Sequence, residues 1–217
     1  MNEDLKNRWE AACPKYQPFV VDGILDEVSW QSANPKIMFL LKESHISSNW
    51  YLIKGNPIDV TKATNPKNIH NIFRWNHLIK SAVSKNKLPD FLESQQALIE
   101  LIKDDHMIRD IAYVNIKKCL GGSTSNSGDI RFFAEKDKGF LCEQISSINP
   151  DIILCGGTFE FYKTIFSNSI LNKISTGLWK DGNRFIIDFN HPGHWQFPGG
   201  QRGLYDKLKN ILKNMPH

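Results

Sequence analysis

The stretch from Arg184 to Trp195 combines a strand pattern with a loop rich in reactive side chains. Its apolar run, residues 185–187, is typical of a buried strand, and two histidines and a tryptophan follow within a few residues. A histidine presented at the end of a rigid strand can exchange a proton near neutral pH, although histidine is also a common structural residue. We therefore take His191 as the first candidate for catalysis.

Polar side chains also follow three other apolar runs of the chain. In open α/β sheets the carboxyl ends of parallel strands share one edge, and ligands bind there. We therefore expect the residues that follow these runs to converge with His191. The runs and the residues after them are 37–41 with Glu43 and Ser44, 111–114 with Asn115, and 151–155 with Gly156.

Helical spacing between the apolar runs predicts the fold. Runs of apolar residues without polar alternation are typical of strands that are covered on both faces, and intervening helices supply those covers. The sequence predicts an α/β fold, a three-layer α/β/α sandwich with a small four-stranded, mostly parallel sheet, as one domain over residues 1–217. The fourth strand is 184–189, residues 170–179 are a connection, and helices are expected at 3–12, 24–32, 69–85, 94–104, 129–148, 158–166 and 202–214.

Bulk composition restricts the class of protein. The chain has 217 residues, a net charge of +4 and four widely spaced cysteines without a C-x-x-C pair. The mild basic excess permits nucleic-acid binding without requiring it. The cysteine spacing indicates neither a zinc site nor a disulfide framework, and no apolar run approaches the ~18 residues of a membrane span. We expect a cytoplasmic, monomeric protein with no membrane association, no metal and no cofactor.

With these residues in hand, the chain from about Lys36 to its C-terminus resembles the uracil-DNA glycosylase superfamily, its divergent bacterial members and iron–sulfur branch most of all. The segment IMFLLKES resembles the family's first motif, with Glu43 at the acidic or amide position. VNIKKC resembles the strand whose Asn pairs with the extracted base, and NHPGHW resembles the loop with the catalytic His. INPDIILCGG resembles the third strand of the family.

The sequence also departs from the family pattern. Ser44 stands where several branches keep an Asp or Asn that handles water, and Gly193 replaces the Ser that would hold a phosphate. Only Cys13 and Cys119 fall near the ligand positions of the iron–sulfur branch, and Asp137 stands about where another cysteine is expected, so no cluster is predicted.

The resemblance implies a role for each candidate. An enzyme of this kind flips a nucleotide out of DNA and reads the base by hydrogen bonding and stacking. His191 would donate to a base oxygen as charge develops, with Glu43 and Ser44 as further catalytic candidates, although an ion pair of Glu43 with Lys42, Lys117 or Lys118 is an open alternative. Asn115 would read the base with a donor and an acceptor. Base-stacking candidates are Trp50 and Tyr51, and DNA-binding candidates are Lys118, Trp195, Arg202 and Gly193.

Three functions remain open at this level. The first is a monofunctional DNA N-glycosylase that hydrolyses the bond to uracil or a modified pyrimidine. The second is a catalytically inactive nucleic-acid or nucleobase binding module of the same fold, which Ser44 and Gly193 motivate. The third is a hydrolase of free nucleosides or small glycosides. The long irregular stretch 47–68 is of a kind that is usually functional or mobile, and the polar loop 121–128 serves equally as a phosphate contact or a plain linker.

Overall fold

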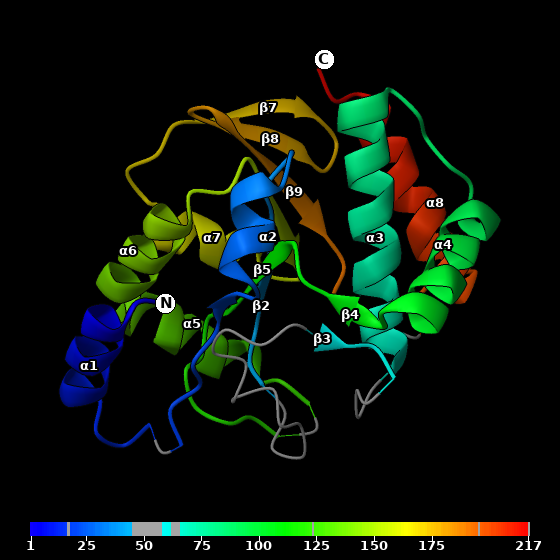
Figure 1. Cartoon of the computed structure of the whole chain (residues 1–217). Helices are drawn as coiled ribbons and strands as arrows, with labels where there is room; N and C mark the ends of the chain where they lie inside the picture. The colour runs from blue at the N-terminus through cyan, green and yellow to red at the C-terminus, as the bar shows by residue number, and fades with distance from the viewer. Residues whose placement is uncertain (17, 45–57, 62–65, 123, 195, 217) are drawn as a thin grey trace.

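A seven-stranded mixed sheet runs through the part of the chain that the computed structural model describes, which is every residue except 17, 45–57, 62–65, 123, 195 and 217. Its strand order is β1-β5-β2-β6-β9-β8-β7 (Figure 1). A separate short sheet pairs β3 (Ile58–Asp59) with β4 (Met107–Ile108). The strands of the main sheet are β1 (Gly23–Ile24), β2 (Ile37–Leu41), β5 (Ile111–Asn115), β6 (Ile152–Gly156), β7 (Leu171–Ser175), β8 (Leu178–Asp181) and β9 (Arg184–Phe189).

The four central strands are parallel and lie in the order β5-β2-β6-β9, which confirms the four strands that the apolar runs predict. Every residue of β2 and of β6 is buried. Along β2, Ile37, Phe39 and Leu41 face one core cluster, while Met38 and Leu40 face the other. Side chains of a strand alternate between its faces, so a strand in the middle of two apolar layers must be apolar throughout.

The predicted sheet of four strands is too small, because three further strands extend it at both edges. β1 pairs antiparallel with β5, and β8 pairs antiparallel with β9 and with β7. The stretch 170–179, predicted as a connection, is therefore mostly a β7–β8 hairpin. Gly177 (φ +79°) and Gly182 (φ +57°) adopt the left-handed backbone conformation that the turns at both ends of β8 require.

Helices cover both faces of the sheet (Figure 1). Within the described residues, none of them has the length and apolar character needed to cross a membrane. The helices that contribute to the core on one face are α1 (Glu3–Ala12), α2 (Glu27–Ser32), α5 (Ser127–Lys136), α6 (Lys138–Ile148) and α7 (Phe159–Ile165), and those on the other face are α3 (Pro66–Lys85), α4 (Phe91–Asp104) and α8 (Gly200–Leu212).

The predicted helices differ from the structure in their bounds, and two of these differences have a clear local cause. The predicted helix 129–148 is two helices that meet at Asp137, whose buried carboxylate accepts a hydrogen bond from the Cys13 thiol (3.6 Å). The predicted helix 24–32 begins only at Glu27, because Asp26 caps it by accepting a hydrogen bond from the backbone N–H of Ser29 (2.8 Å).

Candidate functional site

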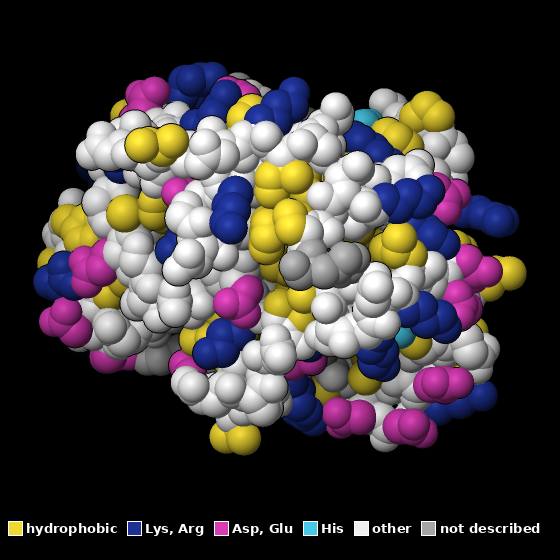
Figure 2. Space-filling model, turned by 90° about the horizontal axis from the view of Figure 1, so that it is seen from above, with side chains coloured by type: hydrophobic (Ala, Val, Ile, Leu, Met, Phe, Trp, Pro, Cys, Tyr) yellow, Lys and Arg dark blue, Asp and Glu magenta, His cyan; other side chains and the backbone are white. Residues whose placement is uncertain are grey.

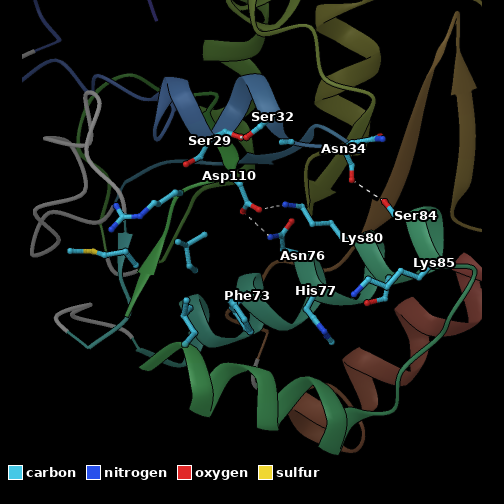
Figure 3. Close-up of a pocket in the computed structure, with 16 residues that line it drawn as sticks. Ser29, Ser32, Asn34, Phe73, Asn76, His77, Lys80, Ser84, Lys85 and Asp110 are labelled. Atoms are coloured by element: carbon cyan, nitrogen blue, oxygen red, sulfur yellow. Dashed lines mark hydrogen bonds and ion pairs between the residues drawn. The ribbon is translucent and has the colours of Figure 1, made fainter. Parts of the chain in front are cut away.

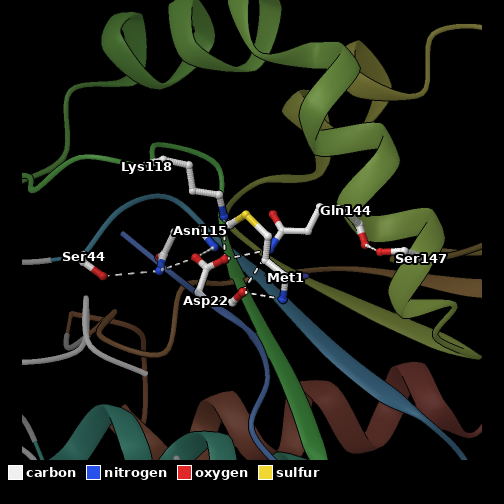
Figure 4. Close-up of polar contacts among 7 residues, drawn as sticks. All are labelled: Met1, Asp22, Ser44, Asn115, Lys118, Gln144 and Ser147. Carbon is white, nitrogen blue, oxygen red and sulfur yellow. Dashed lines mark hydrogen bonds and ion pairs between the residues drawn. The ribbon is translucent and has the colours of Figure 1, made fainter. Parts of the chain in front are cut away.

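Asn115, the last residue of β5, is held from two sides (Figure 4). Its backbone N–H donates to Oδ2 of Asp22 at 2.8 Å. Its side-chain Nδ2 donates to the same Asp22 oxygen and to Oγ of Ser44, each at 3.3 Å. Asn115 and Ser44 are both buried. Their hydrogen bond joins the ends of β5 and β2, as we expected from the polar residues at the ends of these two strands.

Asp22 is the centre of this buried polar network. Its carboxylate accepts hydrogen bonds from Nζ of Lys118 (2.5 Å) and Nε2 of Gln144 (3.0 Å), and its backbone carbonyl accepts one from the N-terminal ammonium of Met1 (3.1 Å). The side chains of Lys118 and Asp22 are both fully buried. Burial lowers the pKa of Lys118, and the charge of Asp22 opposes that shift. A carboxylate with this many donors is fixed in place, and it fixes Asn115 in turn.

The network leaves Asn115 with one unused polar atom. An amide nitrogen carries two hydrogens, and these are directed at Asp22 and Ser44. Turning the amide over would aim its oxygen at the Asp22 carboxylate, which repels it. Oδ1 of Asn115 is buried and has no hydrogen-bond partner among the described residues. Asn115 therefore offers an acceptor, whereas the sequence predicts a donor and an acceptor.

The prediction that Lys118 contacts DNA is not supported by its position. Its side chain is fully buried and paired with Asp22, and its ammonium lies 5.3 Å from the centroid of the Trp9 ring. A phosphate at the surface has no access to a cation in this position. Lys118 belongs to the same buried network as Asn115, and its charge is used inside the protein.

Glu43 forms an ion pair with Lys117, as one of the alternatives for this residue predicts. The Glu43 carboxylate and the Lys117 ammonium are 2.8 Å apart, and the Glu43 side chain is only 5% exposed. Gly121 packs directly against this carboxylate, because a Cβ at Gly121 would lie 2.1 Å from Cδ of Glu43. Gly121 thus covers Glu43, and a larger residue at position 121 would collide with the Glu43 carboxylate.

His191 follows β9 by two residues and is neutral at physiological pH. Desolvation lowers its pKa to about 4, and the positive charges of Lys42 and His194 act in the same direction. The backbone N–H of Gly193 donates to Nδ1 of His191 at 3.1 Å. Because Nδ1 is an acceptor in this bond, the proton of the neutral ring is on Nε2. His191 is thus a neutral N–H donor.

We expect the His191 ring to remain neutral until the pH falls to about 4. Its folded pKa lies below the ~6.5 of an unfolded histidine, so the unfolded chain takes up this proton first as the pH falls. Its contribution to stability is therefore intact above pH ~6.5 and decreases between ~6.5 and about 4. Ring signals of His191 followed by NMR against pH measure the midpoint, and a midpoint near the ordinary value would contradict this account.

Helix α3 supports the loop that carries His191. Nδ2 of the buried Asn71 donates to the carbonyl of Pro192 at 2.8 Å, and Arg74 donates to Oδ1 of Asn71 at 2.9 Å and to Gln95 at 2.9 Å. Asn68, Asn71 and Arg74 are three residues apart and share one helix face, which was the available signal for this role. The sequence prediction considered only the apolar face of this helix and missed them.

Replacing Asn71 with Ala should destabilise the protein by ~1–3 kcal/mol, because it leaves the buried Pro192 carbonyl and part of Arg74 without partners. Denaturant unfolding measures this cost. The matched control is Asn172→Ala on the exposed β7 strand, which should unfold almost as the parent protein does. Equal unfolding midpoints for the two variants would show that Asn71 does not hold the loop.

Three glycines at the ends of β6 and β9 lie next to side chains of neighbouring elements. A Cβ at Gly156 would lie 2.3 Å from Cδ2 of Leu41, and one at Gly157 would lie 3.5 Å from Cε of Lys42 and 3.8 Å from Cβ of His191. At Gly193 a Cβ would lie 2.9 Å from Oδ1 of Asn68, an atom that is buried and has no partner among the described residues. Asn68 thus lies where a side chain at position 193 would have to pass.

The structure brings the predicted site residues to one sheet edge in two groups. Glu43, Ser44 and Asn115 lie at the ends of the neighbouring strands β2 and β5, and His191 lies after β9 with β6 between. Three strand spacings separate the outer positions, roughly 14 Å. Arg202 is exposed in the first turn of α8, whereas Trp50, Tyr51 and Trp195 lie outside the described residues.

The charge distribution at the surface is mixed. On the face that Figure 2 shows, seen from above Figure 1, Lys and Arg side chains are interspersed with Asp and Glu side chains. Among the described residues no three His, Cys, Asp or Glu side chains are grouped so that they could hold a metal ion. The positive charge close to His191 includes that of Lys42.

No family model matches the chain. No curated protein matches its sequence either.

Proposed function

We propose that the chain is a monofunctional DNA glycosylase-like enzyme that hydrolyses the N-glycosidic bond of uracil or a modified pyrimidine flipped out of DNA. The support is the neutral His191 donor at the same sheet edge as the fixed acceptor of Asn115. The four parallel strands between helical layers are consistent with a three-layer α/β/α sandwich of the uracil-DNA glycosylase type. The proposal therefore keeps the family that the sequence resembles.

Hydrolysis breaks the bond between the base nitrogen and the sugar, and the electron pair of that bond goes to the base. A neutral Nε2–H of His191 can donate to an oxygen of the departing base, and the nearby Lys42 charge favours the negative charge that builds there. The Glu43 carboxylate, held by Lys117, supplies negative charge for the sugar as it becomes positive. Water then supplies the oxygen of the new bond to the sugar, and the proton that this water releases neutralises the departed base anion.

Base recognition would rest on Asn115. Because only its Oδ1 is unused, it favours a base edge that presents an N–H, such as the ring N–H of uracil or an exocyclic amino group. The ends of β5 and β9 are roughly 14 Å apart, with β2 and β6 between them. A single pyrimidine-sized ring between the two side chains is the substrate that we propose for this edge of the sheet.

The test is alkali-induced cleavage of oligonucleotides that contain one uracil, hydroxymethyluracil or modified cytosine. We expect scission at one of these bases with the purified chain and without added metal. The alternative function, a catalytically inactive nucleic-acid or nucleobase binding module, is motivated by Ser44, which is engaged with Asn115 and is a poor base. Tight, salt-dependent DNA binding without scission at any base of the panel would favour that alternative.

A further inference from the structure

A groove lies between α2 and α3, away from the candidate site (Figure 3). Its volume is about 620 Å³, which is within the range of sites for organic ligands. Asp110, in its lining, directly precedes β5, whereas Asn115 ends that strand. The groove therefore lies toward the opposite end of β5 from Asn115, and its side chains take no part in the function proposed above.

Positive charge predominates in the lining of this groove. The lining contains three cationic side chains, Lys80, Lys85 and Arg109, and one carboxylate, that of Asp110. Lys80 forms an ion pair with Asp110, and Arg109 forms one with Asp105 at 2.9 Å. Lys85 is exposed and has no hydrogen bond or ion pair among the described residues. An anionic group is therefore the charge that the groove favours, with Lys85 as its free partner.

Asn76 provides a second, independent indication of a ligand. It is only 5% exposed, and its Nδ2 donates to Oδ1 of Asp110 at 3.3 Å. Its own Oδ1 is buried and has no hydrogen-bond partner among the described residues. In Figure 3 its amide reaches from α3 toward Asp110 in the middle of the groove. An unsatisfied buried acceptor is costly, and a ligand with an N–H or O–H donor would satisfy it.

The chemistry of the lining changes in order along α3. Phe73 is at one end of the groove (Figure 3), and the lining also contains the apolar side chains of Leu101, Met107 and Ile108. The acceptor Asn76 comes next, and the cations Lys80 and Lys85 follow toward the other end. From Phe73 to Lys85 the helix rises by roughly 18 Å. The groove thus offers an apolar surface, then a hydrogen-bond acceptor, then positive charge.

We propose that this groove binds a phosphorylated nucleoside. A nucleobase is flat and carries N–H donors, so it suits the apolar end and Asn76, while the phosphate suits the end with Lys80 and Lys85. Ser29 and Ser32 on α2 lie across the groove (Figure 3). The Ser32 hydroxyl donates to carbonyls of its own helix, so the Ser29 hydroxyl is the one that we place against the sugar or the phosphate. The apolar end would thus bind the base, Asn76 would accept a hydrogen bond from it, and the cationic end would bind the phosphate.

Titration calorimetry with nucleoside monophosphates, the matching nucleosides and inorganic phosphate tests the proposal. We expect the monophosphates to bind more tightly than the nucleosides or inorganic phosphate. Lys85→Glu should weaken binding of the monophosphate by about tenfold or more, because it reverses the free charge. Lys103→Glu, an exposed position on α4 outside the groove, is the matched control and should bind as the parent protein does.

Amide chemical shifts recorded with the best monophosphate locate the site. Changes in α2 and α3 around Asn76, retained in His191→Ala, are the expected result and do not depend on the proposed enzymatic function. Three results would overturn the proposal. They are no saturable binding of any monophosphate, equal affinity for inorganic phosphate, and binding that survives Lys85→Glu but disappears in His191→Ala.

Discussion

His191→Ala should lower the rate of base excision by ~10²–10³, the effect of removing one pre-aimed donor to a developing negative charge. The reason is that His191 is a neutral donor whose proton is placed on Nε2 by the Gly193 N–H. Single-turnover cleavage of the best oligonucleotide substrate measures the loss. Among the described residues the His191 ring makes one hydrogen bond, within its own loop, so the variant should lose some packing but keep the fold.

The matched control is His194→Ala, because His194 is three residues away in the same loop and its ring contacts Asn190 and Phe197 instead. This variant should cleave at close to the parent rate. If both variants lost activity equally, the loop conformation would matter and the Nε2–H of His191 would have no specific role. If His191→Ala kept full activity, the assignment of His191 as the donor would be wrong.

Lys118→Met should destabilise the protein by ~3–5 kcal/mol, the range for removing one partner of a buried ion pair. The variant leaves the Asp22 carboxylate buried, with Gln144 and Asn115 as its remaining side-chain donors. Denaturant unfolding measures the change. The control is Lys6→Met, a partly exposed cation paired with Glu3 and Glu10 on α1, for which little change is expected.

The double variant Asp22→Asn, Lys118→Met separates charge from packing. It removes both buried charges, so it should recover much of the stability that Lys118→Met loses. It should still impair function, because the negative charge that fixes the Asn115 amide is gone. Unfolding of Lys118→Met at the parent midpoint would show that Lys118 does not neutralise a buried Asp22 charge.

The central sheet could be predicted from the sequence because its strands are continuous apolar runs. Residues 37–41 and 152–156 are buried on both faces, and such strands differ clearly from the helices between them. The β7–β8 hairpin was missed because its residues are mostly half-exposed and polar, as in Lys173 and Lys180. Its turn signals, Thr176-Gly177 and Gly182-Asn183, are in the sequence and are typical of hairpins.

The candidate site was only partly predictable for a different reason. Asn115, Ser44 and His191 follow strands, so the rule for strand ends finds them. Asp22 is 93 residues from Asn115 along the chain, and an Asp-Gly pair in sequence indicates a turn and nothing more. The same is true of Asn71, because only the packing of α3 against the His191 loop gives its amide a partner. Long-range polar contacts of this kind have no sequence period.

The central claim is that Asn115 and His191 meet around a single base. Its most direct test is an NMR titration of the chain with an oligonucleotide that carries a non-hydrolysable deoxyuridine analogue. The side-chain amide signal of Asn115 and the Nε2 signal of His191 should shift together, with one common affinity, and the same oligonucleotide with adenine in place of the analogue should leave both in place. Binding of the analogue that shifts only one of these signals, or neither, would contradict the account.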